Sequence, residues 1–526
     1  MKNLVCLLIL VAGVVRAAPT LLARVELGPG SSLAAVASVA PVVADAGDFC
    51  LVRASDAELS ALAGQALDIT VLDRIGDEDY YFVRADPDFS ASRLAPHCRV
   101  LARYSRGFIV AAAEDGLHSL TGLKLELARI PDKPIALSSG NRGMPSLPAV
   151  DDSLVWLLVN RVNADTVRST IARLQAFRTR YSSSESLRSA CAWMQGRLAG
   201  FGCDSTYLDT WSSQYAPNVV GVKTGRTNPD LVYIIDGHID NTSPRQYHDT
   251  LAPGSDDNAS GTAAVIEAAR VFADMDFDRT VWFIGFSGEE QGLLGSEDFA
   301  QRCRNRGDSV CAVFNFDMIS YGRENLDKLE VIGRQSNPDC TWLVDFYIAQ
   351  ADTFTTLQTV RIMDSTALYS DHASFWQQGY VAFCGIEDDF TPEYHTLGDT
   401  IGPLYYVNCG TNNWPLATEA IKAAVASIAK LAGAHPRTGI EEGASARTAR
   451  ITRVTPTVGR APVTLALSPR PSPSARVSIY DAAGNLVSTL PASGPSLSWP
   501  GAAAGVYLLQ LADRGATSTA KVVLTN

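Results

Sequence analysis

The chain has 526 residues, 46% of them hydrophobic, and a formal net charge of -12 at pH 7. A chain of this length and composition can bury a large core and is expected to divide into roughly two to four domains. Its acidic balance argues against nucleic acid or an anionic membrane surface as the main partner, because both select basic patches.

The N-terminus has the pattern of an export signal. It reads MKNLVCLLILVAGVVRAAPT, with one lysine, an apolar stretch from Leu4 to Val15, and small residues at Ala17 and Ala18. This stretch is typical of a signal peptide over residues 1–17 and is too short for a stable membrane span, so an uncleaved anchor is less favoured. We therefore expect a mature protein without a membrane span, secreted to the extracellular space or held at the cell surface.

The cysteine content is compatible with such a compartment. Ten cysteines occur, and Cys6 would leave with the signal, so an odd number remains and at least one thiol is unpaired. No CxxC pattern indicates a zinc or redox motif. The first expected disulfide joins Cys303 to Cys311, which flank a short polar loop; Cys50 with Cys98 and Cys191 with Cys203 are less favoured pairs.

Residues 18–145 are expected to form a small N-terminal α/β module. The segments FCLVRASDAELSALAGQ and YYFVRADPDFSASRLAPHCRVLARY each read as a strand followed by a short helix. No cluster of His, Cys or acidic residues indicates a site in this module. It is interpreted as either a pro-region or an accessory domain.

Residues 150–435 alternate helical and strand patterns. VNADTVRSTIARLQAFRTRY shows helical periodicity, and NNWPLATEAIKAAVASIAKLAGA reads as the closing helix. Apolar strands that alternate with helices predict an α/β fold with a mixed, mainly parallel sheet covered by helices on both faces. The expected strands are LVYIIDGHID, TVWFIGFSGEE, VCAVFNFDMIS, KLEVIG and YVAFCGI.

The C-terminal part differs in composition. Residues 436–474 are rich in Ala, Arg, Thr, Pro and Ser, which is typical of a linker. Residues 475–526 contain short alternating strands such as ARVSIYD and GVYLLQL, separated by turn residues. They predict a small β-sandwich.

Polar side chains recur where the strands of the central segment end. In an open α/β sheet, ligands bind beyond the carboxyl ends of the strands. A lone histidine there is most often an ordinary side chain, but several carboxylates crowded at one edge are costly unless a cation neutralises them. These residues are His238, Asp240, Asp256, Asp257, Glu289, Glu290, Asp317 and His395.

This residue set favours zinc over calcium, because zinc accepts both imidazole nitrogen and carboxylate oxygen. Two ions sharing one carboxylate would lie roughly 3.5–4 Å apart. Such sharing explains the adjacent aspartates of GSDDNASG, since helix capping needs only Asn258 or one aspartate. One aspartate of the pair would bridge the ions while its neighbour supports the turn.

The adjacent Glu289 and Glu290 can also be explained by metal binding. Successive strand residues point to opposite faces, so both can reach one pocket only where the strand breaks into a turn, which the glycines of SGEEQGLLGS allow. One glutamate can then bind metal while the other serves as general base. His238 and Asp240 share one face of an extended strand, so Asp240 can orient the imidazole; Asp399 either orients His395 or caps a helix.

Other hydrolase signatures are absent or incomplete. GFSGEE misses the final glycine of a G-x-S-x-G elbow, and no H-E-x-x-H motif occurs. The sequence therefore disfavours a Ser-His-Asp hydrolase and excludes the simple zincin mechanism.

Residues from about 155 to 435 resemble the secreted di-zinc aminopeptidases of the bacterial leucyl aminopeptidase type. Glutamate carboxypeptidase, glutaminyl cyclase and the transferrin receptor ectodomain belong to the same superfamily. The segments that carry the resemblance, in chain order, are GHIDNTS, APGSDDNASGTAAVIEAAR, SGEEQGLLGS, FNFDMIS, SDHASFWQQGY and YHTLGDT.

The resemblance implies a role for each matching residue. His238 and Asp317 would bind one zinc and Glu290 and His395 the other, with Asp256 bridging both. It further implies a cis peptide bond between the paired aspartates. The other implied roles are Glu289 as general acid/base, Asp240 as the partner of His238, and His372 near the substrate pocket.

These roles imply an exopeptidase that removes N-terminal residues from peptide or protein substrates with two zinc ions. The alternatives are a glutaminyl cyclase-like acyltransferase with one zinc and a metal-free receptor-like binding module. Aminopeptidase action is favoured over carboxypeptidase action only by the resemblance. The tail resembles the C-terminal sorting β-sandwich of type IX-secreted proteins, which implies an export machinery as partner, although Trp499-Pro500-Gly501 departs from the usual Trp-Asp-Gly.

Overall fold

The computed structural model separates into one compact unit over residues 1–437 and a second over residues 438–526. The predicted signal peptide and Cys6 lie outside the described residues, and so does the part of the predicted linker over residues 438–449. The structure describes residues 20–437 and 450–525, apart from breaks at 29, 77, 86–87, 106, 114–119, 121–122, 124, 138–142, 323–327, 337, 390, 402–413, 469–470, 483–484, 493 and 514–515.

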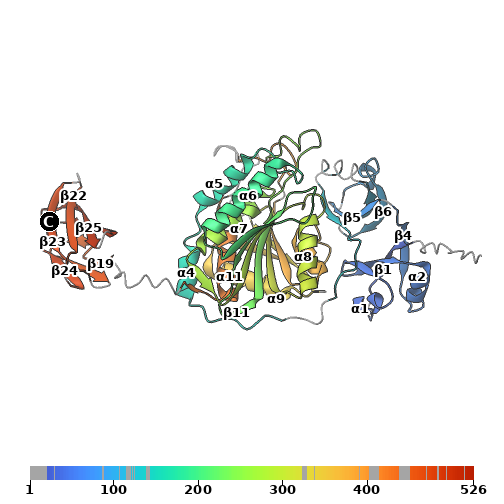
Figure 1. Cartoon of the computed structure of the whole chain (residues 1–526), viewed down its shortest axis with the longest axis horizontal. Helices are drawn as coiled ribbons and strands as arrows, with labels where there is room; N and C mark the ends of the chain where they lie inside the picture. The colour runs from blue at the N-terminus through green and yellow to red at the C-terminus, as the bar shows by residue number, and fades with distance from the viewer. Residues whose placement is uncertain are drawn as a thin grey trace, which may run out of the picture. The chain divides into compact units, whose positions relative to one another are not determined.

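An eight-stranded sheet forms the centre of the first unit (Figure 1), in the order β16-β15-β17-β14-β11-β13-β10-β9. The strands are β9 (Ser205–Asp209), β10 (Asn218–Lys223), β11 (Asn228–His238), β13 (Arg279–Phe286), β14 (Ser309–Phe316), β15 (Lys328–Gly333), β16 (Gln358–Met363) and β17 (Ala382–Glu387). Strands β13, β11, β14 and β17 are neighbours and run parallel, whereas β9, β10 and β15 add antiparallel pairs. The expected mixed α/β class is confirmed.

Helices cover both faces of this sheet. α7 packs on β11, β13 and β14, and α11 packs on α4, α7 and α9, whereas α8 and α10 contact each other. Phe299 of α8 and Phe375 of α10 both lie against Phe286 of β13. The helices are α4 (Asp152–Val159), α5 (Ala164–Gln175), α6 (Glu185–Gly200), α7 (Ala259–Val271), α8 (Leu294–Arg306), α9 (Thr341–Phe354), α10 (His372–Gln377) and α11 (Trp414–Ala432).

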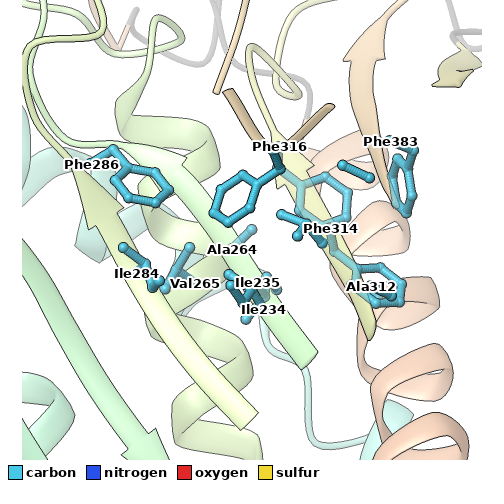
Figure 2. Packing of buried hydrophobic residues seen from close by; sticks show 14 of the residues in the cluster. Ile234, Ile235, Ala264, Val265, Ile284, Phe286, Ala312, Phe314, Phe316 and Phe383 are labelled. Atoms are coloured by element: carbon cyan, nitrogen blue, oxygen red, sulfur yellow. The ribbon is translucent and has the colours of Figure 1, made fainter. Parts of the chain in front are cut away.

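Close packing places the start of α7 directly beside the carboxyl ends of the central strands. Figure 2 shows Ile234 and Ile235 of β11 beside Ala264 and Val265 of α7, and all four side chains are buried. A Cβ added at Gly261, in the first turn of α7, would lie 2.0 Å from the Phe316 carbonyl oxygen, so this approach needs glycine. The loop before α7 is thereby held beside the carboxyl ends of β11 and β14.

The N-terminal module contains two four-stranded sheets whose strand pairs are antiparallel, in the orders β2-β3-β1-β4 and β6-β7-β5-β8. β3 is followed by α2 as expected, but only the three-residue 3-10 helix η1 (Ala91–Arg93) follows β5. The remaining bounds are β1 (Leu21–Glu26), α1 (Leu33–Ala37), β2 (Val42–Asp45), β3 (Phe49–Ala54), α2 (Asp56–Ala63), β4 (Ile69–Arg74), β5 (Asp79–Arg84), β6 (Arg99–Tyr104), β7 (Gly107–Ala112) and β8 (Glu126–Arg129).

Buried contacts join this module to the central sheet. The Arg334 guanidinium donates to the Asp45 carboxylate, and both side chains are 2% exposed. Removing one partner of a buried ion pair leaves the other charge uncompensated. Module and sheet therefore share one core, which also includes Phe49 and Phe82 of the module.

The second unit is a β-sandwich of a three-stranded sheet, β19-β21-β24, and a five-stranded sheet, β20-β26-β25-β22-β23. Its core includes Val477, Leu509 and Trp499. The linker interpretation of residues 436–474 is wrong over β19–β21, because inward-facing Val463 and Leu465 of β21 are buried. The strands are β19 (Arg450–Thr455), β20 (Val458–Gly459), β21 (Val463–Ser468), β22 (Arg476–Asp481), β23 (Leu486–Pro491), β24 (Ser496–Trp499), β25 (Gly505–Asp513) and β26 (Ala516–Leu524).

No disulfide joins the cysteines within the described residues, so the three expected pairs are wrong. Cys303 lies in α8 and Cys311 in β14, where its Sγ donates to the Ser309 carbonyl. Sequence spacing cannot reveal whether two Cβ vectors meet, and a disulfide requires that they do.

A short antiparallel pair, β12 (Met275–Phe277) with β18 (Ala434–Pro436), completes the first unit. Within the described part of the chain, no helix has the length and apolar character needed to cross a bilayer.

Candidate metal centre

The candidate centre lies where the parallel strands of the central sheet end. His238 is the last residue of β11, Asp317 directly follows β14, and Glu289 and Glu290 lie in the loop after β13. His395 comes from the segment that follows β17. The carboxyl ends of neighbouring parallel strands meet at one edge, which explains why residues so far apart in sequence converge.

The first ligand cluster consists of His238, Asp257 and Asp317. His238 Nε2 lies 3.2 Å from Asp317 Oδ1 and 3.2 Å from Asp257 Oδ1. All three side chains are buried. One ligand atom from each lies close enough to the others to hold a single ion.

The second ligand cluster shares Asp257 and adds Glu290 and His395. His395 Nε2 lies 3.1 Å from Asp257 Oδ2 and 2.9 Å from Glu290 Oε2. The two oxygens of Asp257 thus face different clusters, one toward His238 and one toward His395. This is the geometry of a carboxylate that can bridge two ions.

The expectation that Asp256 is the bridge is wrong by one residue. Asp256 Oδ1 accepts hydrogen bonds from the Ser320 amide at 3.0 Å and from the Ser320 hydroxyl at 2.8 Å. Asp256 belongs to neither ligand cluster, and Asp257 takes the expected position between His238 and His395. The cis peptide bond likewise joins Asp257 to Asn258 instead of joining the two aspartates.

Buried hydrogen bonds determine which aspartate faces the centre. The Asp399 carboxylate accepts from the amides of both Asp256, at 2.8 Å, and Asp257, at 3.1 Å. Asp399 therefore holds the backbone of this turn, a contact that neither expected role included. Asn258 caps α7, because its side chain accepts from the Gly261 amide at 2.7 Å.

Both glutamates of the second acidic pair reach the centre. β13 ends at Phe286, and Gly288 has a φ of 76°, so the chain leaves the extended conformation before Glu289. Glu289 Oε2 lies 3.9 Å from His238 Nε2, whereas Glu290 contacts His395. Glu289 therefore lines the pocket outside the Asp257–Glu290–His395 cluster, although it also forms a possible ligand group with His238 and Glu290.

Asp240 supports the centre through the backbone as well as through His238. Its Oδ1 lies 3.7 Å from His238 Nδ1, and its main-chain carbonyl oxygen is closer, at 3.2 Å. Its carboxylate also accepts from the amides of Glu289 at 3.4 Å and Glu290 at 3.3 Å, and from the Ser182 hydroxyl at 2.5 Å. Asp240 therefore helps to position both the imidazole and the glutamate loop.

The centre has an excess of buried negative charge. Burial raises the pKa of Glu290 to about 7 despite the nearby imidazole of His395. Burial alone would lower the pKa of His395, but Glu290 and Asp257 raise it to about 10. Burial also raises the pKa of Glu289 well above its usual value, with further contributions from Asp317 and Glu290. Without a cation, these carboxylates must be balanced by protons or imidazolium.

The residues fit zinc on two grounds. Each cluster combines imidazole nitrogen with carboxylate oxygen, which is a donor set typical of zinc. Glu290 Oε1 is also buried and has no hydrogen-bond partner in the described part of the chain. A buried carboxylate oxygen without a hydrogen bond is costly, and a metal ion would satisfy it.

A pocket lined by His238, Asp257, Glu289 and Asp317 opens onto the centre. His372 does not line it: the imidazole is fully buried between the Asn315 side chain and the Ala367 carbonyl oxygen, so the substrate-binding expectation is wrong. No sequence pattern indicated the apolar wall of the pocket, although Met318 and Tyr394 directly adjoin predicted ligands. The wall residues are Met318, Tyr369, Ile386 and Tyr394.

Comparison with known proteins agrees with this geometry. Residues 218–413 match the model of Peptidase family M28. A probable zinc metalloprotease of Pyrenophora tritici-repentis is 27% identical over 301 residues, covering 47% of this chain and 69% of that protein. Leucine aminopeptidase 1 of Coccidioides posadasii is 27% identical over 301 residues, covering 52% of this chain and 76% of that protein.

Among solved structures, the LapA aminopeptidase of Legionella pneumophila has a TM-score of 0.54 at 20% identity, covering 68% of this chain and 98% of that one. This likeness concerns the fold. The segment matched by the family model contains every member of both ligand clusters. The match to Peptidase family M28 and the two sequence relatives together support a zinc-dependent aminopeptidase hydrolase.

Proposed function

We propose that the protein is an aminopeptidase that holds two zinc ions and uses Glu289 as its general base. The observation that carries this proposal is the position of Asp257, whose two oxygens face His238 and His395 at 3.2 and 3.1 Å. Asp317 would complete one zinc site, and Glu290 the other. Two zinc ions, when bound, would lower the pKa of a shared water and polarise the scissile carbonyl.

The protein's own residues would move the proton. Glu289 lines the pocket and is not part of the cluster around His395, so its carboxylate can accept a proton from the attacking water. The same carboxyl group would then donate that proton to the leaving amine. The Asp240 carboxylate accepts hydrogen bonds from the amides of Glu289 and Glu290, so the backbone that carries the base is held in position.

The pocket supports removal of one residue from a free N-terminus. Met318 and Ile386 provide an apolar wall in this pocket, beside the Glu289 and Asp317 carboxylates. The surrounding carboxylates favour a free amino group over a substrate carboxylate. We therefore propose peptides with an apolar N-terminal residue as substrates, which agrees with the leucine aminopeptidase of C. posadasii as a relative.

Metal analysis and a matched peptide pair test this proposal. Purified protein is expected to contain two zinc ions per chain and to hydrolyse a free leucyl peptide but not its N-acetylated form. Removal of zinc by a chelator should abolish hydrolysis, and added zinc should restore it. Equal cleavage of the blocked peptide would contradict aminopeptidase action, and one tightly held zinc at full activity would favour a single-zinc enzyme.

We also propose that the protein is exported through its N-terminal signal, with the C-terminal β-sandwich as an accessory or sorting domain. The support is the sequence pattern over residues 1–17 and the resemblance of the tail. N-terminal sequencing of protein from the culture medium tests the first part. Recovery only from the cell interior, with the N-terminus intact, would exclude export.

A further inference from the structure

One buried cation lies beneath the candidate centre and takes no part in the proposed chemistry. Arg180 precedes α6, and its side chain is fully buried. Its guanidinium donates to three backbone carbonyls: Ile239 at 2.8 Å, Pro253 at 3.0 Å and Gly254 at 2.7 Å. These carbonyls belong to two different segments, the residue that follows β11 and the loop before α7.

Each of the two segments carries residues of the centre. Ile239 directly follows His238 and precedes Asp240, whereas Gly254 lies three residues before Asp257. The planar guanidinium thus connects the end of β11 with the loop that leads into α7. Asn241 reinforces this connection, because its Oδ1 accepts from the Arg180 amide at 2.9 Å and its Nδ2 donates to the Ala252 carbonyl at 2.6 Å.

The charge of Arg180 is also unusual for a buried arginine. Within the described residues, no carboxylate oxygen lies within the 4.0 Å ion-pair distance of its guanidinium. Burial lowers its pKa to about 10, and the more distant carboxylates of Asp399, Asp240 and Asp257 oppose that change. A cation buried at this cost, bonded only to carbonyls, is suited to holding backbone in place.

We propose that Arg180 is a positioning residue that fixes the separation of His238 and Asp257 by clamping the end of β11 to the loop before α7. This inference rests on the proposed two-zinc function and identifies what holds that centre in shape. A lysine could not reproduce the clamp, because its ammonium is a point donor, whereas the guanidinium is a rigid planar fork. The bridging geometry would then relax even though every ligand is present.

The test compares Arg180→Met with Arg279→Met in the full chain. Arg279 is also buried and donates to Tyr233 Oη and to the Leu431 and Ser146 carbonyl oxygens, but it begins β13 at the end of the sheet opposite the centre. Arg180→Met should release zinc to a chelator about 10- to 100-fold faster and lower kcat by a similar factor, with KM changed less. Arg279→Met should lower only the unfolding temperature.

Arg180→Lys provides a second variant if Arg180→Met does not fold, and it is expected to show a smaller acceleration of zinc release. Either folded Arg180 variant with zinc release and kcat within about twofold of wild type would overturn the proposal. The same acceleration in Arg279→Met would also overturn it, since general destabilisation would then explain the effect. Zinc release is measured independently of hydrolysis, so a wild-type protein that binds zinc but cleaves no peptide refutes the proposed function alone.

Discussion

The two acidic pairs of the centre, Asp256-Asp257 and Glu289-Glu290, look alike in sequence but differ in how they use their residues. Both glutamates approach the centre, Glu290 at 2.9 Å from His395 and Glu289 at 3.9 Å from His238. Only Asp257 of the aspartate pair does so. Its neighbour Asp256 points instead to Ser320.

The difference arises from the donors that surround each turn. In the glutamate loop, Asp240 accepts the amides of both residues and leaves both side chains directed at the pocket. In the aspartate loop, the Asp399 carboxylate accepts hydrogen bonds from the amides of both aspartates. Ser320 donates two further hydrogen bonds, from its amide and its hydroxyl, to the Asp256 side chain alone. A buried carboxylate adopts the orientation in which it can accept hydrogen bonds from nearby donors. The fact that two acidic residues are adjacent in sequence therefore does not show that they have the same role.

Asp257→Asn should have the largest effect and tests the aspartate pair directly. The uncharged amide cannot supply two anionic oxygens between His238 and His395, so zinc content should fall below two per chain. Because both zinc positions share this residue, kcat should fall at least about 1000-fold, equivalent to about 4 kcal/mol of barrier. Metal analysis and leucyl-peptide hydrolysis measure the two effects. A variant with two zinc ions and nearly full activity would refute the bridge.

Glu289→Gln should show that the two adjacent glutamates have different roles. Glutamine keeps the shape of the side chain but cannot accept the proton, so kcat should fall about 100- to 10,000-fold while two zinc ions remain bound. Glu290→Gln is the matched control: it should lose zinc as well as activity, because Glu290 lies 2.9 Å from His395 in the cluster that shares Asp257. Equal zinc loss in both variants would show that the pair does not divide binding from base catalysis.

The fold was largely predictable because its signals are local and repeated. The apolar runs ending at His238 and Phe286 became β11 and β13, and the pattern of strands and helices indicated the mixed sheet. The module was less predictable, since a short polar stretch after β5 became only the 3-10 helix η1. The segment predicted as a linker contains β21, which has three buried inward-facing positions. This strand was not predicted because turn-forming residues surround it in the sequence.

The site was predictable as a set of residues but not in its details. His238, Glu290, Asp317 and His395 converge because strand ends converge, which sequence order alone indicates. The choice between Asp256 and Asp257 depends on Ser320, which lies 64 residues from Asp256 and whose position only the folded chain determines. His372 was misassigned for the same reason, because its partners Asn315 and Ala367 are set by packing.

Asp256→Asn distinguishes the structural assignment from the sequence interpretation. If Asp256 were the bridge, this change would be as harmful as Asp257→Asn. The structure predicts two zinc ions and a kcat lowered by less than about tenfold, since a similar-sized amide still accepts from Ser320. Zinc content of the two variants, measured side by side, is the decisive readout. Loss of zinc from Asp256→Asn alone would reverse the roles of the pair.

Ser320→Ala should have the smallest effect and tests why Asp256 faces away from the centre. The change removes the hydroxyl donor at 2.8 Å but leaves the Ser320 amide, so the buried carboxylate loses one of two hydrogen bonds from this residue. Unfolding free energy should fall by about 1–2 kcal/mol. Ser427→Ala should cost less, because it removes a buried hydroxyl that donates to the Ala423 carbonyl oxygen of its own helix. Zinc content should remain unchanged in both variants; zinc loss in Ser320→Ala would mean that Asp256 contributes to the centre after all.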